Sequence, residues 1–312
     1  MFRCPICHFK KTHTKYKVGK YQYYECGNCK TLFLYPLPSS SSIKRYYSSA
    51  FEYIAGRAEE SRIRKRANII LKKLKHLHPE GKTLLDIGSG YGYFLEEAKK
   101  ISLDSTGIEP NKKLAQSSVF RGTLDEFVKK SNSNKFDFIT AIHVIEHIRN
   151  PFTFIKQVSR LLNRGGILYI ETPNYNSWLA QKEKEQYTFL TPPDHIWLFS
   201  KKSLQLIKLK FPRLSIVSIN TYSYPEHLMG IIKRQMSFLR KQESRRRPCE
   251  RNVRRSENRD LLYRFRIECG MTEMNKQNMR FLLFDKLLAP FFTPLLNLGG
   301  YGSILELYIK KK

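Results

Sequence analysis

Four cysteines near the start of the chain have the spacing of metal ligands. Cys4 and Cys7 form one Cys-x2-Cys pair, and Cys26 and Cys29 form a second pair 18 residues further on. Each pair lets two sulfur atoms of one tight turn reach the same ion, and four thiolates suit tetrahedral zinc. We predict a closed, structural zinc site here; a redox dithiol or disulfides are the alternatives. The short segment between the pairs favours a hairpin, whose folding energy the metal would supply.

A glycine-rich turn, LLDIGSGYGYF at Leu84–Phe94, suggests a ligand that approaches the backbone closely. It lacks the Lys-Ser/Thr of a nucleoside-triphosphate loop, and Tyr93 stands where a dinucleotide fingerprint has its third glycine. Glu109 lies 17 residues beyond Gly92, at the end of the next predicted strand. Its carboxylate can accept hydrogen bonds from both hydroxyls of an unphosphorylated ribose. The alternative is a turn that only packs a helix against a strand.

From Lys82 onward the pattern alternates between strands and helices. We expect strands at 83–87, 103–110, 136–144 and 166–174, and helices at 93–101, 111–119 and 151–162. Such alternation is typical of an α/β fold, with a parallel sheet and helices on both faces. Ligands of these folds bind at the carboxyl ends of the strands.

Four motifs in this order resemble the class I S-adenosylmethionine-dependent methyltransferases. They are LLDIGSGYGYF, GIEP, FDFITAIHVIEHIRNP and LLNRGGILYIETPN. The resemblance is close over Lys82–Ser203 and extends to the late strand ILELYI, which would form a closing antiparallel pair with RLSIVSINTY. It implies a Rossmann-like, seven-stranded methyltransferase sheet with helices on both faces, to which a small N-terminal zinc ribbon is added.

The resemblance also implies the cofactor, S-adenosyl-L-methionine, and the residues that bind it. Asp86 and the backbone of the glycine turn would hold the methionine part, and Glu109 the ribose. Leu124 would lie beside the adenine, although Thr123 stands where many relatives have an aspartate. The full predicted set is Asp86, Gly88, Ser89, Gly90, Gly92, Tyr93, Phe94, Glu109, Pro110, Leu124 and His143.

Methyl transfer needs alignment and, for a hydroxyl acceptor, a base. Three histidines are candidates, and two of them, His143 and His147, lie in the element His143-x2-Glu146-His147. That element is similar to a carboxylate-x2-Glu-His motif that binds a divalent cation in enzymes resembling the ubiquinone-pathway O-methyltransferases. Because a histidine replaces the first carboxylate, the element here would suit a softer metal. The alternative is that these residues only order the loop before Pro151.

His195 is the third candidate base. Its surroundings, TPPDHIWLFSKKSL, resemble the EHxxxFS element of zinc-ribbon sugar methyltransferases, in which the histidine is implicated as the base. Asp194 replaces the glutamate of that element, and Pro192 replaces a tyrosine of those enzymes. A histidine that only contacts substrate, or that packs on Trp197, is the alternative.

Composition and motifs predict the following domain organisation. The zinc ribbon covers 1–33, a linker and helical cap cover 34–78, and the methyltransferase core covers 79–223 and 299–312. An excursion at 224–298 contains a basic insert at 233–260 and an apolar lid or interfacial segment at 281–298. The basic insert has the composition of a disordered segment.

The chain is strongly basic, with 56 Lys and Arg against 27 Asp and Glu, a net charge of +29. Such charge favours polyanionic partners such as RNA or an anionic membrane, or it reflects a solvated basic surface. The start MFRCPIC lacks the apolar core of a signal peptide, so we expect a cytoplasmic protein, with membrane association through the apolar segment as a further option.

Three functions fit these features. The first is a methyltransferase acting on a small molecule, such as a sugar, a lipid-linked saccharide or a phenol. An RNA methyltransferase is less expected, because no catalytic cysteine or NPPY-like element for base chemistry is present. A non-catalytic adapter that has kept the fold is the third.

Overall fold

The computed structural model describes residues 3–39, 41–43, 57–111, 113–115, 119–130, 134–223, 297 and 300–312. The chain divides into two compact units, one of residues 1–221 with 303–312 and the other of residues 222–302. The description below concerns the first unit. The predicted basic insert at 233–260 lies outside the described residues, as does 281–298 apart from Asn297. The predicted domain boundaries stay predictions.

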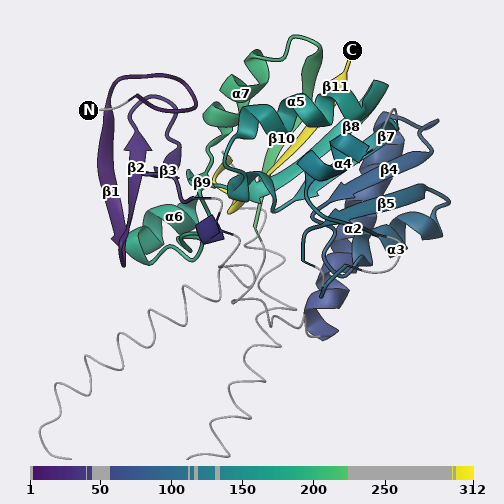
Figure 1. The fold of residues 1–312 in the computed structure, drawn as a ribbon, viewed down its shortest axis with the longest axis horizontal. Helices are drawn as coiled ribbons and strands as arrows, with labels where there is room; N and C mark the ends of the chain where they lie inside the picture. The colour runs from purple at the N-terminus through teal and green to yellow at the C-terminus, as the bar shows by residue number, and fades with distance from the viewer. Residues whose placement is uncertain are drawn as a thin grey trace, which may run out of the picture. The chain divides into compact units, whose positions relative to one another are not determined.

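A seven-stranded sheet forms the centre of this unit (Figure 1). Its strands, in spatial order, are β10 (Leu214–Tyr222), β11 (Ile304–Lys311), β8 (Leu162–Pro173), β7 (Phe136–Ile142), β4 (Thr83–Ile87), β5 (Asp104–Glu109) and β6 (Val119–Arg121). The strands from β8 to β6 are parallel, whereas β11 runs antiparallel to β8. The predicted sheet is confirmed, and the neighbouring positions of β10 and β11 agree with the expected closing pair.

Helices cover both faces of the sheet, as predicted. Successive side chains of a strand point to opposite faces, and the apolar ones on both faces need to be buried. On one face, Leu85 of β4 belongs to a cluster with α4 (Leu124–Lys130), α5 (Pro151–Leu161) and α7 (Lys201–Leu209). Its neighbour Leu84 belongs to a second cluster, with α2 (Arg57–Leu77) and α3 (Tyr93–Lys100).

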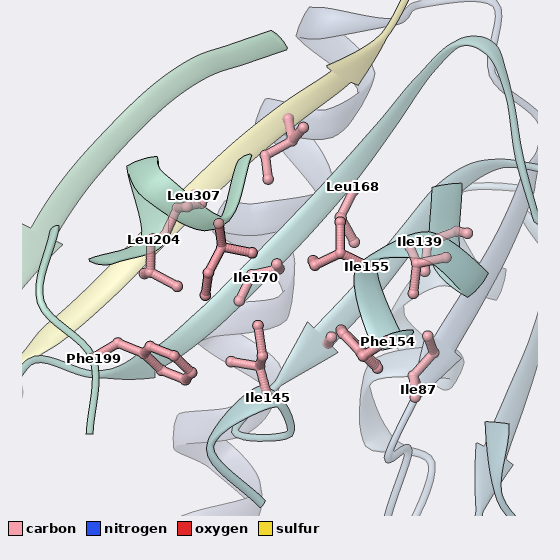
Figure 2. Close-up of a cluster of buried hydrophobic side chains, with 14 of the residues drawn as sticks. Ile87, Ile139, Ile145, Phe154, Ile155, Leu168, Ile170, Phe199, Leu204 and Leu307 are labelled. Carbon is pink, nitrogen blue, oxygen red and sulfur yellow. The ribbon is translucent and has the colours of Figure 1, made fainter. Parts of the chain in front are cut away.

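Figure 2 shows part of the first cluster. Its labelled members are Ile87, Ile139, Ile145, Phe154, Ile155, Leu168, Ile170, Phe199, Leu204 and Leu307, and all are buried. They come from the sheet, from α5, from α7, from the loop after β7 and, for Phe199, from the residue that follows β9. This apolar layer supports the loop after β7, which carries several of the candidate site residues.

The helix expected at 111–119 is wrong for the residues that the structure describes. Asn111 and Lys113–Ala115 form a turn, and Val119 begins β6. The side chain of Asn111 accepts a hydrogen bond from the Lys113 backbone N–H at 3.0 Å. This is the bond of a helix N-cap, but the chain enters β6 at Val119, which pairs with Gly107 of β5.

The N-terminal segment, residues 3–34, forms a structure that we call the ribbon. Its strands β1 (Thr12–Val18) and β2 (Tyr21–Cys26) make the expected hairpin, and β3 (Leu32–Leu34) adds to it. A fourth strand, β9 (Trp197–Leu198), comes from far along the chain and pairs antiparallel with β3. The ribbon therefore shares one sheet with the segment that carries His195, which was not predicted.

Two further short helices, α6 (Trp178–Glu183) and a 3-10 turn at Lys184–Gln186, connect β8 to β9, and another 3-10 turn, η1 (Ile145–His147), follows β7. Among the described helices, none has both the length and the apolar character needed to cross a membrane.

Candidate active site

The glycine turn joins β4 to α3 and has an open outer side. Gly88 has φ +76°, and a Cβ atom there would lie 2.7 Å from Val144, so a side chain would clash with the loop after β7. Gly90 also has positive φ, +52°, but a Cβ atom there would have nothing within 4 Å. The first glycine is needed for close packing, and the second leaves the backbone exposed to a ligand.

Glu109, the last residue of β5, is tied to this turn. One carboxylate oxygen accepts the Gly90 N–H at 2.9 Å, and the other accepts the Asn111 N–H at 2.8 Å. Burial raises the pKa of Glu109, although these two bonds act in the opposite direction. Each oxygen keeps a further lone pair, so the oriented carboxylate can still accept ribose hydroxyls.

Asp86 and Ser89 add polar groups beneath the turn. Asp86 is buried, and its carboxylate accepts a hydrogen bond from the Thr140 hydroxyl at 2.6 Å. Burial raises the pKa of Asp86 to about 7, the Thr140 bond lowers it, and the charge of Glu109 raises it further. The Ser89 hydroxyl is buried and has no hydrogen-bond partner in the described part of the chain. Two carboxylates and an unpaired hydroxyl suit a polar, cationic ligand such as S-adenosylmethionine.

The remaining predicted donor residues surround the same edge of the sheet. Tyr93 begins α3 and stacks on Tyr91, with ring centroids 5.7 Å apart. Phe94 is buried in α3, exposed Pro110 directly follows Glu109, and buried Leu124 begins α4. Their roles in binding the donor stay predictions.

Thr123 has a structural role at the start of α4. Its hydroxyl accepts the Glu126 N–H at 3.3 Å, and the Glu126 carboxylate accepts the Thr123 N–H at 2.8 Å. This reciprocal pair is a capping box, which satisfies backbone donors at a helix start. It gives a physical reason for a threonine at a position where an aspartate was expected from the resemblance.

His143 lies after β7 between two buried carboxylates. Its Nδ1 is 3.1 Å from Glu146, and its Nε2 is 3.6 Å from Glu171. Glu146 also accepts the Thr172 hydroxyl at 2.9 Å. Burial would raise the pKa of Glu146, but the His143 bond and the nearby histidine charges lower it to about 2. Glu146 is therefore a fixed negative charge inside the protein.

His147 and His195, both proposed as catalytic from the sequence, are in contact. Their ring centroids are 4.8 Å apart. His147 Nδ1 lies 2.9 Å from a carboxylate oxygen of Asp194. Burial lowers the pKa of His147, but this bond and the charge of Glu146 outweigh it and raise the pKa to about 9. His147 is therefore a cation at neutral pH.

The environment of His195 has the opposite effect. Burial and the positive charge of His147 lower the pKa of His195 to about 4, so its ring is neutral. Its Nδ1 is 2.7 Å from the Phe189 carbonyl oxygen, which can only accept, so Nδ1 carries the proton. Among the described residues, none makes a hydrogen bond to His195 Nε2. This nitrogen therefore has a lone pair that can accept a proton.

Glu146, His147 and His195 also have the spacing of metal ligands, because one donor atom of each lies within 4.8 Å of the others. The sequence grouped Glu146 and His147 with His143 instead. Geometry therefore adds His195 to this set, and the acid-base and metal interpretations share the same three side chains.

A buried hydrogen-bond network behind His143 was not predicted from the sequence. Arg66 of α2 binds Glu171 at 3.2 Å and the Tyr169 hydroxyl at 2.9 Å, and it also contacts Glu306 of β11. Tyr169 itself donates to Glu171 at 2.6 Å. An acid inside the apolar strand LYIETP was the signal that would have pointed to a buried, paired carboxylate.

The four ribbon cysteines lie together. Their sulfur atoms all lie within 4.8 Å of one another, with Cys4–Cys29 at 3.7 Å and Cys7–Cys26 at 3.5 Å. These distances are too long for disulfides, and they are close to the ~3.8 Å edge of a tetrahedron with Zn–S bonds of about 2.3 Å. Burial raises the pKa of Cys26 to about 11, whereas the hydrogen bond with Cys4 lowers the pKa of Cys29 to about 5, so a cation would be needed to keep Cys26 ionised. The cluster fits one zinc ion.

Comparisons with known proteins agree with this architecture. Residues 59–208 match the family model described as "Methyltransferase domain". A ubiquinone biosynthesis O-methyltransferase of Caulobacter vibrioides is 29% identical over 106 residues, which cover 30% of this chain and 42% of that protein. The corresponding enzyme of Pelagibacter ubique is 28% identical over 152 residues, which cover 40% and 62%. The chain thus spans about half the length of these curated relatives.

A solved structure, a SAM-dependent methyltransferase from Archaeoglobus fulgidus, is 18% identical, with a TM-score of 0.49 and coverage of 81% of this chain and 94% of that chain. The match over 59–208 contains the glycine turn, Glu109 and the element after β7. Residues 59–208 of the chain therefore carry a methyltransferase domain.

Proposed function

We propose that the protein transfers a methyl group from S-adenosylmethionine to a hydroxyl group of a small molecule, a sugar, a lipid-linked saccharide or a phenol, with His195 as the base. The observation that carries the proposal is the contact between the His195 and His147 rings, whose centroids are 4.8 Å apart, together with the bond from His195 Nδ1 to the Phe189 carbonyl, which leaves Nε2 as the acceptor. Paired titratable groups whose pKa values are driven apart are characteristic of acid-base sites. The O-methyltransferase relatives support a hydroxyl acceptor.

The donor side of the site would bind a cationic sulfonium. When bound, S-adenosylmethionine supplies an electrophilic methyl group. The carboxylate of Glu109, oriented by two backbone N–H groups, would accept the ribose hydroxyls. Asp86 would balance the positive charge, and the open backbone at Gly90 would allow close approach.

On the acceptor side, His195 Nε2 would take the proton of the hydroxyl group. The ring is neutral at physiological pH, so it does not have to lose a proton first. Its low pKa makes it a weak base in the resting protein, but the charge of Glu146 stabilises the imidazolium form as it develops. His147, already protonated, would orient Asp194 and the loop rather than accept a proton.

We further propose that the ribbon binds one structural zinc ion through Cys4, Cys7, Cys26 and Cys29. All four ligands would be protein thiolates, so no coordination position would remain for catalysis. Zinc would stabilise the fold of residues 3–34.

The first experiment measures donor binding by isothermal titration calorimetry with S-adenosylmethionine. Glu109→Ala should abolish binding. Asp137→Ala is the matched control, because Asp137 also accepts two backbone N–H groups, at 2.8 and 3.1 Å, but at the amino end of β4. A folded, zinc-loaded wild-type protein that does not bind the donor would contradict the proposal and favour an adapter.

Acceptors are then screened with labelled donor, sugars and phenols before RNA. His195→Gln should remove transfer to the acceptor while donor affinity is unchanged. Transfer to RNA but to no small acceptor would overturn the proposed substrate class.

A further inference from the structure

We infer that the ribbon positions the proposed base, and that Tyr23 is the positioning residue through which it acts. The inference deepens the proposed function, because it rests on the role of His195 as the base. It gives the ribbon a task in the reaction in addition to its own fold.

The contact between the ribbon and His195 is direct. The Tyr23 hydroxyl donates a hydrogen bond of 2.7 Å to the backbone carbonyl of His195, across 172 positions of sequence. Tyr23 is fully buried in β2, and this burial raises its pKa far above the ordinary tyrosine value. The hydroxyl therefore stays protonated and remains a donor at any physiological pH.

The backbone next to His195 is held on both sides. The Ile196 carbonyl accepts the Leu34 N–H of β3 at 3.0 Å, and the Ile196 N–H donates to the Glu146 carbonyl at 2.9 Å. The following residues, Trp197 and Leu198, pair with β3. The segment that carries the base thus lies between the ribbon and the loop after β7, and it is hydrogen-bonded to each.

This backbone position determines what the ring can do. The His195 ring donates its Nδ1–H to the Phe189 carbonyl, and that bond fixes the tautomer with the lone pair on Nε2. If the His195 carbonyl loses its Tyr23 partner, the peptide group can rotate and the bond to Phe189 loosens. The base would then populate the other tautomer, whose Nε2 carries a proton and cannot accept one.

The cysteine cluster stabilises the strand that carries Tyr23. Tyr23 is three residues before Cys26 in β2, and it pairs with Leu34 of β3. Cys29 makes a second link, because its carbonyl accepts the Ser200 hydroxyl at 2.6 Å, and Ser200 caps α7. The ribbon therefore holds both ends of the segment 195–200, one through Tyr23 and the other through the knuckle that would hold zinc.

The test compares Tyr23→Phe with Tyr175→Phe in the full, zinc-loaded chain. Tyr175 is a matched control, because its hydroxyl also bonds to the ribbon, donating to the Glu25 carboxylate at 3.0 Å. That bond does not involve His195. Nitrogen-15 shifts of the histidine rings report the tautomer at pH 7.5, and His195→Gln assigns the signal. The charged groups that face the His195 ring, which are Glu146, His147 and Asp194, are the same in the wild type and in both tyrosine variants.

Wild type and Tyr175→Phe should show one tautomer with the proton on Nδ1, and Tyr23→Phe should show a mixture. Replacing Tyr23 with 4-aminophenylalanine, which restores a donor, should return the wild-type signature. A single Nδ1–H tautomer in Tyr23→Phe would overturn the inference, and so would a mixture in both phenylalanine variants. Calorimetry with S-adenosylmethionine on the same samples tests the proposed function separately, because Tyr23→Phe should bind the donor as wild type does.

Discussion

Two clusters of potential metal ligands lie near β9. They differ in whether their donor groups are of one chemical kind or of several. In the ribbon, four sulfur atoms of one chemical kind surround one point, and three of the four cysteines are buried. In the active site, Glu146, His147 and His195 are three unlike groups with pKa values near 2, 9 and 4. Four identical thiolates suit the permanent binding of an ion. Three groups with different pKa values leave one lone pair, that of His195 Nε2, which can react. The following predictions test this difference.

The largest effect is expected from Cys29→Ser. Structural zinc binding in small zinc domains is worth about 10–16 kcal/mol, so loss of one thiolate should remove bound zinc and unfold the ribbon. Zinc content by elemental analysis and thermal unfolding check this. The exposed His13→Ala variant should keep one zinc per chain; if it loses the metal, the four-cysteine assignment is wrong.

The second effect concerns the active-site cluster. His195→Gln should lower the rate of methyl transfer by about 10²–10⁴-fold, the usual contribution of a positioned base, with little change in donor affinity. His76→Gln, on the exposed face of α2, should behave as wild type. A rate for His195→Gln within a factor of three of wild type, roughly the range of context effects, would remove the base assignment.

A smaller, pH-dependent effect should come from Asp86. Its pKa in the free protein is about 7, and a cationic donor prefers the ionised form. Donor affinity should therefore be constant above pH 7 and fall by up to about tenfold per pH unit below it. Calorimetry between pH 5.5 and 8.5 measures this slope.

Asp86→Asn should weaken donor binding and abolish its pH dependence. The raised pKa also means that ionised Asp86 destabilises the folded state, and that this cost is complete above pH 7. The variant should therefore unfold at a higher temperature than wild type at pH 8. A lower unfolding temperature would contradict the stated cause of the shift.

The smallest effect is expected at the edge of the ribbon. Lys202 donates to the Asn28 side chain at 2.8 Å, but both groups are at the surface. Lys202→Ala should change the free energy of unfolding by less than about 1 kcal/mol, since exposed polar pairs contribute little. Denaturant titration measures it, and a loss above 2 kcal/mol, roughly the value of a buried pair, would mean that this contact holds the ribbon in place.

Much of the seven-stranded sheet could be predicted, because residues close together in the sequence determine its strands and helices. The strand at 83–87, the glycine turn and the capped helix at Pro151 are each encoded by neighbouring residues. The helix expected at 111–119 was wrong because Val119 belongs to β6, where it pairs with Gly107 of β5, a long-range contact that apolar spacing does not reveal.

The site was less predictable because it depends on distant pairs. His147 and His195 were both named from the sequence, but their contact depends on the loop after β7 meeting the segment before β9. The pairing of β3 with β9 has almost no sequence signal, since Trp197–Leu198 is only two residues long. Tyr23 was therefore invisible as a partner of His195, and the individual site roles stay predictions.

The position of β11 has a consequence for how the sheet is assembled. β11 lies between β8 and β10, although residues 223–303 separate it from β10 along the chain. During synthesis, β8 and β10 emerge well before the strand that must insert between them. Until it arrives, the edge of β8 is unpaired, and Arg66 lacks the Glu306 carboxylate.

Closing a long connection costs little more than closing a short one, because each doubling of loop length adds only about 0.6 kcal/mol. Evolution can therefore lengthen the segment before β11 at small thermodynamic cost, provided that the register of Glu306 opposite Glu171 is kept. The penalty is kinetic. A nascent chain must protect an open strand edge for the time needed to translate about eighty residues, roughly 4–16 s at 5–20 residues per second.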